Sequence, residues 1–152
     1  MVMIFDDYSY LVQGDKLPEV EFLSLDAGQA HLIKRGHIVL LSFFIINCKH
    51  CKHMLEYLQE EIWPEFQASR RLLLVVGRGH TPEELRDFRD AGNYILPFAA
   101  DPERTNYDLF AEKKVPRNYL FNPQGQLIYQ TRGFDLDQMS TLKLLLQDLD
   151  EE

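Results

Sequence analysis

An apolar run from Ile38 to Ile46, interrupted only by Ser42, constrains the fold of this chain more than any other stretch. The run is rich in β-branched and aromatic side chains, which favour extended backbone. Because apolar and polar residues do not alternate along it, neither face of the strand is expected to meet solvent. The sequence therefore predicts a central strand of a mostly parallel sheet, covered on both sides.

Two cysteines follow this strand at the point where a helix is expected to begin. Cys48 and Cys51 are separated by two residues, and apolar residues then recur at helical spacing. The apolar face of this helix carries Met54, Leu55, Leu58, Ile62 and Phe66. A thiol at a helix start faces unpaired N–H groups and the positive end of the helix dipole, which favour the reactive thiolate. Cys48 lies nearer that end, so we expect Cys48 to attack a partner and Cys51 to resolve the mixed disulfide.

The rest of the chain alternates between short apolar runs and helical patterns. Further strands are predicted over residues 19–25, 71–77, 95–99, 117–122 and 127–131, and residues 30–34 form either a strand or a helical turn. Helices are predicted over residues 49–69, with a kink or break near Trp63 because Pro64 follows it, and over 82–91 with Gly92 as the stop. Two more are predicted over 103–112 and after Asp135.

This order of elements predicts the architecture. Alternating strands and helices favour parallel crossovers, and the closing hairpin favours an antiparallel edge. We therefore expect an α/β fold, a three-layer α/β/α arrangement with a mixed central sheet. A single domain is expected over residues 1–152, with its core over about 14–149 and an N-terminal extension before it.

Composition and charge exclude several classes of function. The net charge of −8 argues against general nucleic-acid binding, because phosphates would be repelled. No apolar run reaches the ~18 residues that a membrane helix needs. Residues 1–10 carry Asp6 and Asp7 and no basic region, so they are not a signal peptide. A cytoplasmic protein and a periplasmic or secreted one whose leader was removed both remain open, and we expect a monomer.

Three motifs in combination resemble the thioredoxin superfamily. The first is Cys48-Lys-His-Cys51 after a buried strand, the second is Lys114-Val-Pro116 immediately before the hairpin, and the third is the turn Asn122-Pro-Gln-Gly125 within it. The lead-in over residues 14–22 is similar to the branch that holds secreted thiol-disulfide oxidoreductases and alkyl-hydroperoxide-reductase-like proteins. The resemblance covers residues 14–149.

The resemblance implies a thioredoxin-like fold and thiol-disulfide exchange with protein thiols and disulfides. It also implies an upstream redox partner that exchanges electrons with the cysteine pair, and no bound cofactor. It also implies a cis peptide bond before Pro116, with Val115 and Pro116 facing the disulfide and holding the partner chain. Lys49 and His50, between the cysteines, are expected to tune the thiolate. The direction of electron flow stays open. A His at position 50 and a Val before the proline resemble the pattern of bacterial disulfide-forming oxidases, whereas the N-terminal half resembles the reducing branch.

The sequence also departs from the family pattern. Asn47 stands where Trp usually precedes the first cysteine. Ser42 stands where thioredoxin has a buried Asp, and because a serine cannot accept a proton as that carboxylate does, proton transfer at the cysteines must differ. A peroxiredoxin carries Thr or Ser three residues before its peroxidatic cysteine and Pro further upstream. Ile45 and Leu41 occupy those positions here, so direct peroxidase activity is not expected.

Two alternatives to an oxidoreductase remain. The first is a non-catalytic binding module that keeps the fold and holds a partner on the Val115–Pro116 face. The second is a zinc or copper carrier, in which Cys48 and Cys51 supply sulfur ligands and His50 and His53 supply nitrogen ligands.

Overall fold

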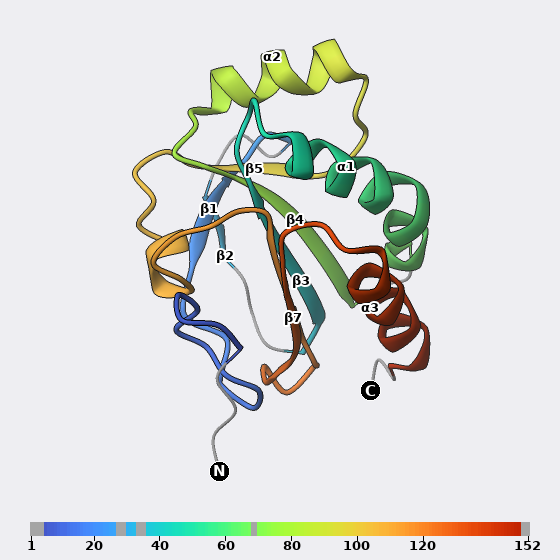
Figure 1. The fold of residues 1–152 in the computed structure, drawn as a ribbon. Coiled ribbons are helices and arrows are strands. Elements are labelled where there is room, and N and C mark those ends of the chain that lie inside the picture. The colour runs from blue at the N-terminus through green and yellow to red at the C-terminus, as the bar shows by residue number, and fades with distance from the viewer. Residues whose placement is uncertain (1–4, 27–29, 33–35, 68–69, 150–152) are drawn as a thin grey trace.

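A computed structural model describes residues 5–26, 30–32, 36–67 and 70–149 of the chain. Its centre is a sheet in the order β2-β1-β5-β4-β3-β6-β7 (Figure 1). The strands are β1 (Glu21–Ser24), β2 (Ala30–Leu32), β3 (Ile38–Phe44), β4 (Arg71–Arg78), β5 (Phe98–Asp101), β6 (Arg117–Phe121) and β7 (Leu127–Arg132). β3, β4 and β5 run parallel to one another. On one side of them β6 pairs antiparallel with β3 and β7 with β6, and on the other side β1 pairs antiparallel with β5 and β2 with β1. The predicted α/β class with a mixed sheet is confirmed.

β3 is the central strand that the apolar run predicts. Every one of its side chains is buried. Because successive side chains point to opposite faces of a sheet, Leu40 and Phe44 pack into one core and Leu41 and Phe43 into the other. β3 is also paired on both edges, with β4 and β6. Strand and core therefore fix the position at which the chain leaves β3 toward the cysteines.

The three α-helices cover one face of the sheet. Side chains of α1 (Lys49–Tyr57), α2 (Pro82–Gly92) and α3 (Leu136–Asp148) share a single buried cluster with the β3 side chains of that face. The opposite face is covered by the short 3₁₀ helix η3 (Tyr107–Leu109) and by the N-terminal segment through Leu11. Figure 1 shows α1 and α3 on one side of the strands and η3 with the N-terminal segment on the other.

The helix that follows the cysteines changes its geometry earlier than predicted. α1 ends at Tyr57 and continues as a π-helix over Leu58–Ile62 and a 3₁₀ turn over Trp63–Phe66. Pro64 lacks a backbone N–H, so regular α-helical hydrogen bonding cannot run through it, and the turns before it rearrange. The predicted end, at residues 68–69, lies outside the described part. The predicted apolar face is confirmed, because Met54, Leu55, Leu58, Ile62 and Phe66 are all buried.

Two predicted elements around residues 95–112 are wrong in extent. The strand expected over 95–99 begins only at Phe98 and ends at Asp101, and the helix expected over 103–112 shortens to η3. The predicted helix is interrupted because the buried Asp101 carboxylate accepts the backbone N–H groups of Asn106 and Tyr107. Arg104 adopts a left-handed φ of 63°, so a helix cannot begin at Glu103.

The other helix ends follow the predicted caps. Thr81 and Glu84 form a reciprocal capping box at the start of α2, and the Asp135 carboxylate accepts two N–H groups at the start of α3. Gly92 is not the stop: it is the last residue of α2, and Asn93 takes the left-handed position. Glycine is needed at position 92 because a Cβ there would collide with the ring of Tyr94.

No helix among the described residues has the length and apolar character that a membrane crossing requires.

We predict that Leu142→Ala destabilises the fold by about 2–5 kcal/mol, because it removes a large buried side chain and leaves a cavity. Leu142 of α3 is 0% exposed, whereas its neighbour Leu144 is 60% exposed. Leu144→Ala is therefore the matched control and should change the free energy of unfolding by less than about 0.5 kcal/mol. Urea unfolding of both variants makes the comparison, and equal losses would contradict the packing of α3 described above.

Candidate active site

Cys48 is the N-cap residue of α1, directly after the turn that leaves β3. Its backbone is extended, with φ −123° and ψ 116°, and its sulfur accepts the backbone N–H of Cys51 at 3.2 Å. Asn47 makes the turn possible by adopting a left-handed φ of 64°, a conformation that Asn tolerates better than most residues. The predicted strand-to-helix junction is confirmed, and it places the Cys48 sulfur at the unpaired N–H groups of the helix.

The two cysteines are joined in a disulfide with Cα atoms 5.1 Å apart. Their surroundings differ. The Cys51 side chain is 1% exposed, whereas Cys48 is only half-buried. A partner sulfur approaching from solvent therefore meets Cys48 first.

The residues between and after the cysteines lie on the surface. Lys49 and His50 are both exposed in the first turn of α1. His53, one turn further, is exposed but stacks on the ring of Phe134, with ring centroids 5.8 Å apart. His50 and His53 do not join the sulfurs in a ligand cluster, because no group of three or more His, Cys, Asp or Glu suited to a metal occurs among the described residues.

The Val115–Pro116 peptide bond is cis, as the resemblance implies. Pro116 is buried and Val115 is half-buried. β6 begins with the next residue, and its Arg117 pairs with Phe43 near the end of β3. This register brings the proline to the level at which β3 ends and the chain turns toward Cys48. Val115, like Cys48, also packs against the buried cluster that contains Cys51.

The Arg117 side chain fixes the loop before the cis proline, an anchor that sequence reasoning missed. Arg117 is 0% exposed, and its guanidinium donates to the carbonyl oxygens of Lys113 at 2.9 and 3.2 Å and of Lys114 at 3.1 Å. The Tyr107 hydroxyl also donates to the Lys114 carbonyl. A buried charge must be paired, and here the partner is the Asp6 carboxylate, 3.1 Å away. The clue in the sequence was a charged residue at the start of a strand that ends in Tyr119, Leu120 and Phe121.

Asp6 links the N-terminal segment to this loop. Burial by itself raises the pKa of Asp6, but the backbone N–H groups of Ser9 and Tyr8 and the Arg117 guanidinium outweigh burial and hold the pKa below its usual value. The backbone nitrogens of Ser9 and Tyr8 lie 2.7 and 3.0 Å from the Asp6 carboxylate oxygen that accepts these hydrogen bonds. The carboxylate is therefore stabilised in its charged form by the folded chain.

A cluster of neutral polar side chains lies beneath α1, on the face of the sheet that carries the helices. The Ser42 hydroxyl donates to the Met54 sulfur at 3.4 Å, and the Asn118 amide donates to the same sulfur at 3.1 Å and to the Thr131 hydroxyl at 3.1 Å. Ser42, Asn118 and Thr131 are at most 1% exposed. The buried carboxylate of thioredoxin thus has no charged counterpart at this position.

A groove opens beside Cys48, between α1 and α2. Its volume is about 470 Å³, and it is lined by Ile45, Asn47, Cys48, Lys49, Cys51, Lys52, Leu55, Phe88, Ala91, Gly92 and Tyr94. The aromatic rings of Phe88 and Tyr94 stack, with centroids 5.3 Å apart. The groove combines an apolar lining with two lysines next to the half-buried Cys48.

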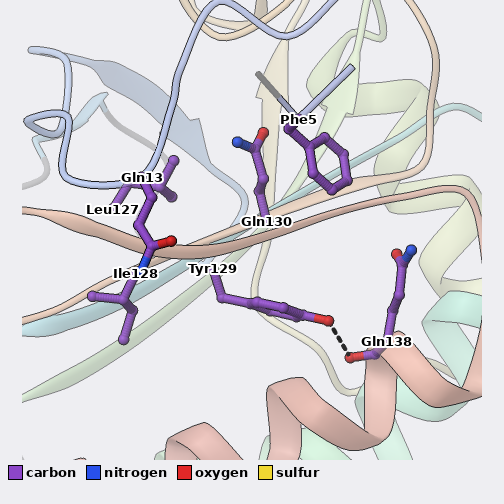
Figure 2. Close-up of a pocket in the computed structure, with 7 residues that line it drawn as sticks. All are labelled: Phe5, Gln13, Leu127, Ile128, Tyr129, Gln130 and Gln138. Carbon is purple, nitrogen blue, oxygen red and sulfur yellow. Dashed lines mark hydrogen bonds between the residues drawn. The ribbon is translucent and has the colours of Figure 1, made fainter. Parts of the chain in front are cut away.

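A second pocket, drawn in Figure 2, contains neither cysteine. It lies along β7 and is lined by Phe5, Gln13, Leu127, Ile128, Tyr129, Gln130 and Gln138. The Tyr129 hydroxyl donates to the main-chain carbonyl of Gln138 at 3.4 Å, and burial raises the pKa of this tyrosine. The pocket has no ionised or nucleophilic side chain, so the groove beside Cys48 is the candidate site.

Comparison with known proteins identifies the family of this chain. A model of the AhpC/TSA family matches residues 13–130, which is more than half of the chain. The chain belongs to the AhpC/TSA family. A curated relative, the thiol-disulfide oxidoreductase ResA of Bacillus subtilis, is 22% identical over 99 residues, covering 65% of this chain and 55% of ResA. The chain thus spans about half the length of that relative.

Solved structures show the same fold. A putative protein disulfide isomerase from Bacteroides thetaiotaomicron has a TM-score of 0.89 at 19% identity, covering 95% of this chain and 94% of its own. A putative thiol:disulfide interchange protein DsbE from Chlorobium tepidum has a TM-score of 0.75 at 20% identity, covering 88% and 95%. StoA from Bacillus subtilis has a TM-score of 0.66 at 19% identity, covering 84% and 95%. The predicted thioredoxin-like fold and the resemblance to this branch are confirmed.

We predict that the Asp6–Arg117 pair contributes stability at neutral pH that is lost in acid. Because folding lowers the pKa of Asp6, this contribution is complete above the unfolded value of about 3.9 and disappears as the pH falls through the folded value. Asp6→Asn should therefore cost about 1–3 kcal/mol at pH 7. Its stability curve should meet that of the wild type as the pH approaches the lower folded value.

The measurement is the free energy of unfolding in urea at a series of pH values. The exposed neighbour Asp7 provides the matched control. Asp7→Asn should follow the wild-type curve throughout. A gap between wild type and Asp6→Asn that stays constant down to strongly acid pH would contradict the stabilising ion pair.

Proposed function

We propose that this protein is a thiol-disulfide oxidoreductase whose working group is the Cys48–Cys51 pair. The observation that carries the proposal is the disulfide at the N-terminus of α1, with Cys48 accessible and Cys51 buried. The proposal covers the whole chain as one thioredoxin-like domain acting on protein thiols and disulfides, with an upstream redox partner. The name of ResA, the disulfide and the site geometry support it.

The proposed reaction has two exchange steps. The Cys48 thiolate attacks one sulfur of a partner disulfide, forms a mixed disulfide and releases the second partner sulfur as a thiolate. Cys51 then loses its proton and attacks the Cys48 sulfur, which forms the intramolecular disulfide and releases the first partner sulfur. Two electrons pass to the partner, and its thiolates take up protons. The reverse sequence oxidises a partner, and the reduction potential of the pair relative to its partners decides the direction.

The roles of the surrounding residues follow from their places. The helix N-terminus stabilises the Cys48 thiolate, and Lys49 and His50 add positive charge or donors in the same turn. Val115 and Pro116 lie beside the point where β3 ends, so we assign to them the contact with the partner chain. The adjoining groove provides apolar surface for a neighbouring partner side chain.

We predict that Cys51→Ser turns the protein into a trap. Cys48 can still attack a partner disulfide, but the mixed disulfide then has no internal thiol to resolve it. Covalent adducts should accumulate on non-reducing gels of cell extract and disappear when an external thiol is added. Mass spectrometry of the adducts identifies the partners.

Two variants control this experiment. The double variant Cys48→Ser, Cys51→Ser should trap nothing, and Cys48→Ser alone should trap far less than Cys51→Ser because its remaining thiol is buried. Efficient trapping by Cys48→Ser but not by Cys51→Ser would reverse the assigned roles. The absence of thiol-sensitive adducts with every variant would favour the binding-module alternative.

A further inference from the structure

One side chain from outside the cysteine motif holds the segment that leads into it. Beyond Phe44 the chain leaves the sheet, so the backbone N–H of Ile46 no longer has a partner in a neighbouring strand. This N–H donates to Nε2 of His80 at 2.9 Å. The next residue, Asn47, makes the left-handed turn, and Cys48 follows it. His80 therefore binds the backbone two residues before Cys48.

The backbone of His80 is itself firmly placed. It lies in the short connection from β4 to α2, where Gly79 N–H donates to the Asp101 carbonyl at 2.8 Å and His80 N–H to the Gly77 carbonyl at 3.4 Å. Thr81 then caps α2. The imidazole thus extends from a fixed turn across to the end of β3, and its side chain is only 18% exposed.

The hydrogen bond determines which ring nitrogen carries a proton. Because Nε2 accepts an N–H, it is unprotonated, and the neutral ring carries its proton on Nδ1. Nδ1 lies 3.7 Å from a carboxylate oxygen of Glu84, whose other oxygen accepts the Thr81 N–H at 2.9 Å. A negative group beside Nδ1 favours this tautomer.

We propose that His80 is a positioning residue for Cys48. By accepting the Ile46 N–H, it fixes the entry of the chain into the N-cap and so keeps the Cys48 sulfur at the N–H groups of α1. Without this acceptor the half-buried Ile46 N–H is left unpaired, the turn relaxes, and the helix stabilises the Cys48 thiolate less. The inference rests on the proposed function where it links Cys48 reactivity to thiol-disulfide exchange. The reactivity itself is measured on the protein alone, without a partner.

The test compares three replacements of His80. A glutamine amide oxygen can take the place of Nε2, an asparagine amide lies nearer to the place of Nδ1, and a leucine offers no acceptor. The reduced proteins are alkylated with iodoacetamide below the pH of full thiolate formation, and peptide mass spectrometry reports the rate at Cys48. The reduction potential of the pair is measured in glutathione buffers. His37→Leu, at an exposed histidine before β3, is the matched control.

We expect His80→Leu and His80→Asn to slow Cys48 alkylation by about tenfold, the size of one lost hydrogen bond. The disulfide should become less oxidising by about 30 mV, which is the same tenfold factor for a two-electron couple. His80→Gln should restore both values to within about twofold of wild type, and His37→Leu should leave them unchanged. Circular dichroism checks that each variant is folded.

Two results would overturn the assignment. One is a folded His80→Asn or His80→Leu protein with wild-type alkylation rate and potential. The other is His80→Gln falling as far as His80→Leu, which would mean that the ring matters and its acceptor nitrogen does not. Both results concern His80 alone, whereas failure of the proposed function appears as the absence of trapped partners with Cys51→Ser.

Discussion

The hydrogen bond from the Cys51 backbone N–H to the Cys48 sulfur, 3.2 Å long, is the contact on which the chemistry of this molecule depends. It exists because Cys48 is the cap of α1, and Cys48 is the cap because β3 ends at Phe44 and Asn47 turns the chain. β3 in turn is held by strands on both edges and by apolar cores on both faces. Burial of one strand thus fixes the electrostatic environment of one sulfur.

Polar anchors on either side keep the surroundings of that sulfur in place. On the α2 side, His80 accepts the Ile46 N–H. On the β6 side, Arg117 donates hydrogen bonds to the carbonyl oxygens of Lys113 and Lys114 before the cis proline. The Asp6 carboxylate balances the charge of Arg117. Each anchor joins backbone outside regular secondary structure to a side chain, fully buried for Arg117 and 18% exposed for His80. The loops that border the site are therefore ordered by specific hydrogen bonds and not by apolar packing alone.

The sequence predicted the parts of this arrangement that short-range patterns determine. The apolar run, the helical spacing after Met54 and the cap residues Thr81 and Asp135 each act within a few residues, and each led to the observed element. Asp101 defeated the helix predicted after it because its carboxylate captures N–H groups five and six residues ahead, which no helical pattern reveals. The Asp6–Arg117 and Ile46–His80 contacts join residues 111 and 34 positions apart, so only the folded chain brings them together.

The reduction potential of the Cys48–Cys51 pair tests the central claim most directly. Equilibration in graded thiol and disulfide buffers, with both thiols counted by alkylation and mass spectrometry, yields this value. A working dithiol pair should show a reversible two-electron transition with a midpoint between about −270 and −120 mV, the range from thioredoxin to DsbA. A pair that stays oxidised below about −300 mV would be a structural disulfide, and that result would contradict the account.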